Sequence, residues 1–222
     1  MRLGVLGTGV VGQSLASGWL SAGHDVMLGS RSRTNEVAVA WAAESGRAAS
    51  NGTFADAVEH AEVVVNCTPG EVSLSVLNGV DTAAFGNKVV LDVSNPLDFS
   101  AGFPPTLSIV NDDSLGEAIQ RCLPEARVVK SLNTVTASVM VEPSRLDGRH
   151  DLFVAGNDAT AKRVVTGLLA DLGWDAADVH DLGGIDAARG IEMYLPLWLR
   201  LMGTIGGAEF NVHVVRSTAP SG

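Results

Sequence analysis

Cysteine is scarce in this sequence, with Cys67 and Cys122 as the two examples among 222 residues. They lie far apart and belong to no Cys-x-x-Cys motif or Cys/His cluster, which argues against a disulfide framework and against a zinc site. We expect both to be reduced core residues.

Positive charge and long apolar runs are also in short supply. Lys and Arg number 15 against 25 Asp and Glu, which gives a formal net charge of −10. A nucleic-acid partner requires clustered cations, so we expect none. No run of about 18 uncharged apolar residues exists to span a bilayer, and the N-terminus is typical of a fold strand and not of a secretory signal. We therefore expect no membrane partner and a cytoplasmic location.

Glycine is plentiful, and its placement near the N-terminus is informative. Residues 1–6 form a short apolar strand that leads to Gly7, Gly9 and Gly12, and a helix pattern follows. In this G-x-G-x-x-G arrangement, the glycines make a tight turn, let the backbone approach a diphosphate, and let helix and strand pack closely. Glycines in such turns also occur for packing alone, but a position between strand and helix favours a dinucleotide site.

The end of the second predicted strand, over residues 24–28, indicates which dinucleotide is bound. An NAD-selective fold places an Asp or Glu about 20 residues after the glycines. This chain has Ser30, Arg31 and Arg33 there, and no acidic residue between Asp25 and Glu36. A hydroxyl and a guanidinium bind a 2′-phosphate, which favours NADP(H). The alternative is that both arginines are solvated loop charges.

The rest of the chain predicts a Rossmann-type α/β fold, a doubly wound and mostly parallel sheet with a small C-terminal extension. Buried strands over 61–67, 88–93 and 127–134 end in polar turns, where ligands of open α/β sheets bind. Residues 98–116 are irregular and predict either a flap on the substrate side or a surface loop. We expect one unit over 1–222, with an α/β core at 1–180 and a C-terminal helix and strand at 181–222.

The C-terminal part of the sequence predicts packing contacts of an apolar helix, and we assign no chemical role to it. Residues 195–205 are apolar on nearly all sides, which indicates burial in this subunit or against a second one, so a homodimer is expected. Residues 210–216 alternate like an edge strand, and residues 217–222 suggest a loose tail.

Six ordered motifs carry a family resemblance over nearly the full length of the chain. They are G-T-G-x-x-G at 7–12, G-S-R at 29–31, T-P-G at 68–70, S-N-P at 94–96, K-x-x-N-T at 130–134 and D-L-G-x-x-x-A-A-R at 181–189. This set resembles the coenzyme F420-dependent NADP oxidoreductases. It is also similar to the cytosolic reductase domain of membrane ferric reductases, which passes electrons to a flavin.

The resemblance implies hydride transfer between NADP(H) and a deazaflavin or flavin-like ring, with the protein holding two rings face to face. It implies that Thr8, Gly9, Val10 and Val11 bind the diphosphate and that Ser30 and Arg31 bind the 2′-phosphate. The nicotinamide is expected beside Thr68, Pro69, Asn95 and Pro96. The deazaflavin is expected beside Asn133 and Thr134, where the archaeal pattern L-H-T-I-P is replaced by Leu132 to Thr136.

Lys130 is a further candidate for the acceptor side. A cation near a flavin-type N1 and C2 carbonyl stabilises the charge that develops there on reduction. A strand-end lysine in water is the other interpretation. No catalytic side chain and no metal site are predicted. Two other functions stay open, namely an NADP(H) redox sensor without turnover, and a reductase of the hydroxyacid dehydrogenase or imine reductase type.

Overall fold

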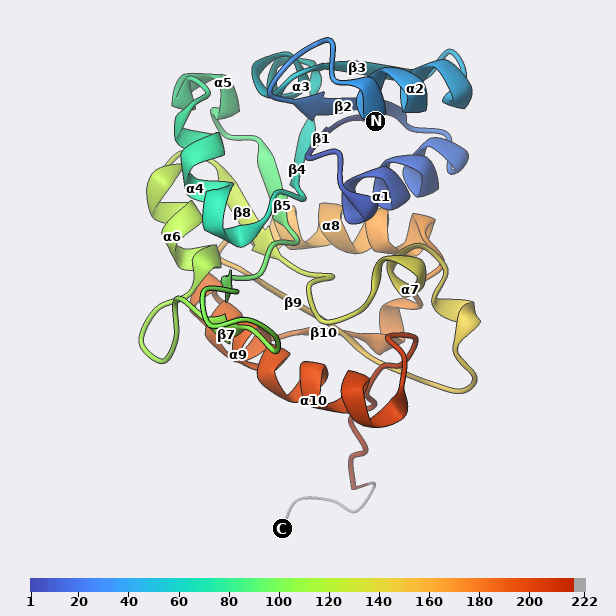
Figure 1. Cartoon of the computed structure of the whole chain (residues 1–222), viewed down its shortest axis with the longest axis vertical. Coiled ribbons are helices and arrows are strands. Elements are labelled where there is room, and N and C mark those ends of the chain that lie inside the picture. Colours follow the sequence, from blue (N-terminus) through green and yellow to red (C-terminus); the bar gives the residue numbers. More distant parts are fainter. Residues whose placement is uncertain (218–222) are drawn as a thin grey trace.

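One sheet runs through the molecule with helices on both faces (Figure 1). The structure is a computed structural model that describes residues 1–217. The strand order is β10-β9-β8-β5-β4-β1-β2-β3. The strands are β1 Arg2–Leu6, β2 Asp25–Ser30, β3 Ala49–Thr53, β4 Val63–Asn66, β5 Val89–Asp92, β8 Arg127–Lys130, β9 Leu152–Gly156 and β10 Val179–Asp181.

The strand pairing confirms the expected fold class. Six strands, from β3 across to β8, pair in parallel, and β9 joins β8 in the antiparallel sense. The chain order reverses between the adjacent strands β1 and β4, which is the switch point where doubly wound sheets bind ligands. Val63 to Val65 and Val89 to Leu91 are buried because helices cover both faces of these strands.

Two hydrophobic clusters hold the layers together, one on each face of the sheet. The first lies under α1 Val10–Ser21, α2 Glu36–Ser45, α7 Ala137–Val141 and α8 Ala159–Asp171. The second lies under α3 Phe54–His60, α4 Gly70–Asn78, α5 Thr82–Phe85, α6 Leu115–Cys122 and α9 Ala188–Met193. Three short 3-10 helices are η1 Pro143–Arg145, η2 Ala176–Asp178 and η3 Ile185–Ala187.

Local signals in the sequence place several helix starts. The Thr53 hydroxyl accepts from the Asp56 N–H and the Asp56 carboxylate accepts from the Thr53 N–H, a capping box for α3. Ser114 caps α6 through the Glu117 N–H, and Asp158 caps α8 through the Ala161 N–H.

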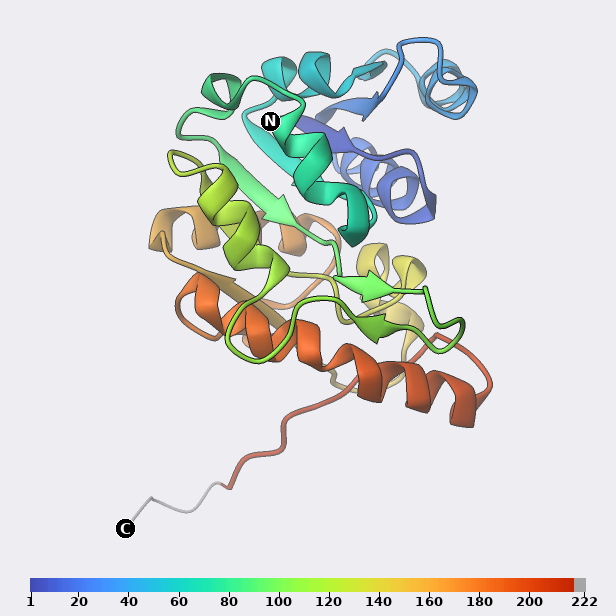
Figure 2. The ribbon, with the colours of Figure 1, turned by 60° about the vertical axis from the view of Figure 1, so that its left-hand side comes forward.

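The irregular segment contains more structure than the sequence indicates. A two-stranded hairpin, β6 Leu97–Asp98 with β7 Thr106–Leu107, extends beyond the carboxyl edge of the main sheet on the side of α10 Leu195–Ile205 (Figure 2). Each of these strands is two residues long, which is too short for an alternating pattern to be detected in the sequence.

The edge strand expected over residues 210–216 is wrong, because this segment pairs with no strand of the sheet. The buried carboxylate of Asp151 holds it instead, accepting a hydrogen bond from the Val214 N–H and lying 3.1 Å from His213 Nδ1. Residues 218–222 of the expected tail lie outside the described residues.

Candidate functional site

A cavity of about 760 Å³ opens at the carboxyl edge of the sheet, across the ends of β1, β2, β4 and β5. Its lining includes many of the residues that the sequence singles out, namely Gly7, Thr8, Gly9, Val10, Val11, Ser30, Arg31, Thr68, Pro69 and Asn95. Gly12, Arg33, Pro96, Lys130, Asn133 and Thr134 are outside this lining. Gly7 and Asn95, 88 positions apart, thus line one cavity because parallel strands end at one edge.

The three glycines of the first turn meet different steric demands. Gly7 has a φ of +117°, which side chains rarely allow. A Cβ on Gly12 would lie 2.0 Å from the Gly7 carbonyl oxygen, so helix and turn are in close contact. A Cβ on Gly9 would have no described atom within 4 Å. The turn therefore keeps free space at Gly9 for a bound group.

Helix α1 begins at this turn without neutralising its own N-terminus. Gly9 provides no side-chain cap, and the first turn holds no acidic residue. The first N–H groups of a helix carry partial positive charge and have no partner inside the helix. An anion such as a diphosphate fits beside Gly9 for this reason.

The two arginines after β2 differ in their partners. Arg33 forms a bidentate ion pair with Asp56, at 2.7 Å from Nε and 2.5 Å from Nη2. Arg31 is exposed, lines the cavity, and makes no hydrogen bond or ion pair with another residue among 1–217. Ser30 Oγ donates to the Ser32 carbonyl at 2.6 Å. Arg31 is thus the guanidinium that is free for a ligand, and a ligand contact by Arg33 stays a prediction that requires the Asp56 pair to open.

The turns after β4 and β5 pack against each other at the middle of the cavity. A Cβ on Gly70 would lie 1.9 Å from the Asn95 carbonyl oxygen. Beneath them, Asn66 donates to Asp92 at 2.9 Å and accepts from Thr68 Oγ1 at 2.6 Å. Asn66 and Asp92 are neighbours in the strand register, so the strand ends support both turns with one buried polar network.

Cys67 lies at the end of β4 and lines the same cavity. Burial, and secondarily the charge of Asp92, raise the pKa of its thiol. The thiol therefore stays protonated at neutral pH and is a poor nucleophile.

The structure does not bring Lys130 to the surface of the cavity. Its side chain is fully buried, with Nζ 2.7 Å from Asp92 Oδ2 and 2.9 Å from Glu192 Oε1. Burial lowers the pKa of Lys130, but the two carboxylates raise it by more, so the net pKa is above its usual 10.5 and the ammonium is charged. The expected direct contact with an acceptor ring does not agree with this burial, because no part of the side chain is accessible.

Asn133 and Thr134 lie in the turn after β8, beside the turn at Asn95. Asn133 Nδ2 donates to Asn95 Oδ1 at 2.8 Å, and Asn95 Nδ2 donates to the Asn133 carbonyl at 2.9 Å. Asn133 Oδ1 and Thr134 Oγ1 are buried without a hydrogen-bond partner in the described chain. Leu132, before them, has a φ of +65°, a costly conformation for a branched side chain. Unpaired polar atoms and backbone strain at one turn are typical of a binding site.

Several lining residues are missed by the sequence motifs. Phe54 from α3, Val72 and Val76 from α4, and Leu97 and Phe99 from the hairpin add apolar surface to the cavity. Phe99 remains 55% exposed at its edge. Apolar residues carry no local signal that separates a cavity wall from a core, so only the packing identifies them.

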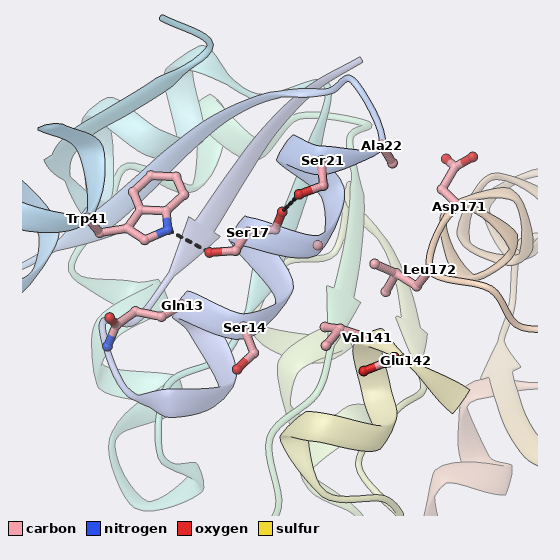
Figure 3. A pocket seen from close by; sticks show the side chains of 11 residues that line it. Gln13, Ser14, Ser17, Ser21, Ala22, Trp41, Val141, Glu142, Asp171 and Leu172 are labelled. Atoms are coloured by element: carbon pink, nitrogen blue, oxygen red, sulfur yellow. Dashed lines mark hydrogen bonds between the residues drawn. The ribbon is translucent and has the colours of Figure 1, made fainter. Parts of the chain in front are cut away.

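A second hollow, of about 680 Å³, runs along the outer side of α1 (Figure 3). Ser17 Oγ accepts from Trp41 Nε1 at 2.9 Å there, and Ser21 donates to the Ser17 carbonyl. Glu142 and Asp171 are its charged lining residues, and the lining contains no Lys or Arg. Two carboxylates repel a phosphate, so the first cavity is the better dinucleotide site.

Comparisons with known proteins bear on the whole chain. Residues 2–96 match the family model described as NADP oxidoreductase coenzyme F420-dependent. The F420-dependent NADP reductase of Methanothermobacter marburgensis is 30% identical over 211 residues, covering 90% of this chain and 92% of that protein. The protein of the same name from Methanocaldococcus jannaschii is 32% identical over 149 residues, 66% of this chain and 64% of that protein, slightly under two thirds of its length.

A crystal structure from Arthrobacter sp. FB24, named as a candidate F420-dependent NADP reductase, has a TM-score of 0.92 at 47% identity. The match between the two structures covers 97% of this chain and 100% of the Arthrobacter chain. Fold and cavity together define a Rossmann-type protein with its ligand site at the switch point of the sheet. The chain belongs to the family of coenzyme F420-dependent NADP oxidoreductases. The family resemblance based on the six motifs is thereby confirmed.

Proposed function

We propose that this protein transfers a hydride between NADP(H) and the ring of coenzyme F420 in the cavity at the carboxyl edge of the sheet. Membership of the family supports the expected class, an NADP-dependent oxidoreductase that uses F420 as the second cofactor. The observation that carries the choice of cavity is the unpaired Arg31 beside the open space at Gly9.

The chain's own groups fit the phosphate half of NADP(H). The N–H groups at the start of α1 face the space at Gly9, where they would bind the diphosphate between Thr8 and Val11. Arg31 would bind the 2′-phosphate, because a guanidinium without a protein partner gains a bidentate, charge-assisted contact. Ser30 Oγ donates to the Ser32 carbonyl and accepts from the Ser32 N–H, and these two hydrogen bonds hold the turn that carries Arg31.

The nicotinamide half is proposed to lie beside Thr68, Pro69, Asn95 and Pro96, with the acceptor ring near Asn133 and Thr134. When both cofactors are bound, they supply the hydride chemistry themselves. Asn133 Oδ1 and Thr134 Oγ1 are buried without a partner, so their contact with a ring requires the turn after β8 to open towards the cavity. The apolar side chains of the cavity wall, Phe99 among them, would exclude water from the ring.

We further propose that the whole chain acts as one unit and forms a homodimer. The C-terminal helices belong to the unit because Glu192 of α9 binds Lys130 of β8 and the N–H groups of α6. Leu197 and Ile205 on α10 are more than half exposed, which supports a contact with a second subunit. No helix within residues 1–217 has the length and apolar character needed to cross a membrane. The cytoplasmic location stays a prediction.

The proposed function is tested by mixing the purified protein with NADPH and F420, and separately with FAD or FMN, while following the near-ultraviolet absorbance of the reduced nicotinamide. Turnover of NADPH with F420, and not with FAD or FMN, supports the proposal. Turnover with FAD or FMN in its place would reassign the acceptor. Tight NADPH binding without turnover of any acceptor would contradict the proposal and favour a redox sensor.

A further inference from the structure

Lys130 is a buried charged group that the proposed function leaves without a role. Its Nζ contacts three oxygens, from Asp92, from Glu192 and from the Ser94 carbonyl. A lysine ammonium has three N–H donors, so these contacts use all of them. Lys130 has no donor left for a ligand, and its function must act through its partners.

The three partners belong to different parts of the fold. Ser94 lies in the turn after β5 and lines the cavity. Asp92 ends β5 and also accepts from Asn66 Nδ2 and Ser94 Oγ, at 2.9 and 2.7 Å. Glu192 comes from α9, a hundred residues further along the chain. Lys130 thus joins the central turns of the cavity to the C-terminal helices.

Glu192 is itself held at a defined place. Its two oxygens accept from the N–H groups of Leu115 and Gly116, at 2.8 and 3.0 Å, at the start of α6. The partial positive charge of this helix end offsets part of the negative charge that two carboxylates and one ammonium leave. Because α6 packs on the sheet, Glu192 gives Lys130 a fixed partner from the C-terminal helices.

Stability alone does not account for such a cluster. Apolar residues of similar volume often replace buried ion pairs at no cost in stability, because desolvation of the charges offsets their attraction. What the charges add is geometry, since an ammonium with three fixed acceptors sets the position of each one. One of these acceptors, the Ser94 carbonyl, belongs to a residue that lines the cavity and lies next to Asn95.

We propose that Lys130 is a positioning residue that fixes the Ser94–Asn95 turn, and thereby aligns the nicotinamide half of NADP(H), with Glu192 holding Lys130 from α9. This inference rests on the proposed function. Within residues 1–217, Lys130, Asp92 and Glu192 form no hydrogen bond or ion pair with Gly9, Ser30 or Arg31, so the phosphate half is independent of the cluster.

The test compares two ligands by calorimetry, NADPH and 2′-phospho-ADP-ribose, which lacks the nicotinamide. Lys130→Met is expected to weaken NADPH at least fivefold and to change the truncated ligand less than twofold. The double variant Lys130→Met/Glu192→Gln removes one charge of each sign and provides the same comparison where the single variant fails to fold.

Glu117→Gln is the matched control, because Glu117 joins α6 to α9 through Arg189 without contacting Lys130. We expect it to leave the ratio of the two affinities unchanged. Equal losses for both ligands, no loss for either, or the same selective loss in Glu117→Gln would overturn the inference. Wild-type protein that binds neither ligand would instead refute the proposed function.

Discussion

Gly9 and Gly12 both lack a side chain, but the reason that a side chain is excluded differs between the two positions. At Gly12 the space is filled by protein, because the Gly7 carbonyl oxygen would lie 2.0 Å from a Cβ. At Gly9 the space is open, and the φ of −73° suits any residue. Gly12 is therefore needed for the fold and Gly9 for the ligand.

Substituting each glycine by alanine should separate these purposes. Gly9→Ala is expected to keep the melting temperature of the wild type and to lose NADPH affinity, because the methyl group occupies the diphosphate space. Gly12→Ala should lower the free energy of unfolding by about 1–3 kcal/mol through overpacking. Thermal melts with and without NADPH measure both. A destabilised Gly9→Ala variant would contradict this assignment.

Arg31 and Arg33 form a second matched pair, since Asp56 binds Arg33 and not Arg31. Arg31→Ala is expected to weaken NADPH by about 1.5–3 kcal/mol, the value of a hydrogen bond to a charged group, with little change for NADH. Arg33→Ala should change neither affinity much. Fluorescence titration with the two nucleotides measures this. If both variants lose NADPH equally, or if Arg31→Ala loses NADH as much as NADPH, Arg31 does not read the 2′-phosphate.

At the scale of elements, α9 and α6 are joined by two carboxylates, and each helix contributes one of them to a contact with the other. Glu192 of α9 caps the start of α6, and Glu117 of α6 binds Arg189 of α9 at 2.8 and 2.6 Å. Gly116 permits the close approach, since a Cβ there would lie 3.0 Å from Ala188 Cβ. The C-terminal helices are thus tied to the sheet by polar contacts as well as by packing.

This attachment should depend on pH. The hydrogen bonds from Arg189, opposed by burial and aided by Ser114, lower the pKa of Glu117 below its usual 4.5. Since the folded pKa is the lower one, Glu117 stabilises the folded state above about pH 4.5, and this contribution is lost as the pH falls through the folded pKa. Glu117→Gln should lower the melting temperature at pH 7 by roughly 2 to 4 °C.

The difference in melting temperature between Glu117→Gln and the wild type should become smaller as the pH falls below 4.5. Melts from pH 7 to pH 3 by circular dichroism provide the measurement. A difference that stays constant over this range would show that the charge of Glu117 contributes nothing to the docking of α9.

Element prediction from the sequence succeeded where the pattern was long enough. The buried strands β4 and β5, with their runs of valine, were both predicted. The four-residue α5, the five-residue α7 and the β6–β7 hairpin were missed because so few residues contain no full period. Residues 210–216 alternate as a strand does, but Asp151 binds them instead of a strand edge.

At the scale of the molecule, two exposed apolar side chains on α10 support the proposed contact with a second subunit. Leu197 and Ile205 are 56% and 58% exposed. We expect the wild type to be a dimer in solution and Leu197→Lys/Ile205→Lys to be a monomer, because charged side chains at the core of an interface are strongly disfavoured. Light scattering coupled to size-exclusion chromatography measures the mass.

Val39→Lys on α2 is the control, since Val39 is also an exposed apolar residue, 43% exposed, on a different helix. It should leave the mass unchanged. A wild-type monomer, or a double variant that remains a dimer, would show that α10 is not the contact between subunits.

The amino-acid sequence by itself determined the fold class, the glycine turn and the presence of two arginines after β2, because each depends on residues close together along the chain. Only the tertiary structure decided which of these groups are available. It paired Arg33 with Asp56 and left Arg31 open, and it buried Lys130 between Asp92 and Glu192. Contacts between residues far apart in sequence arise from strand order and helix packing, which no local pattern specifies.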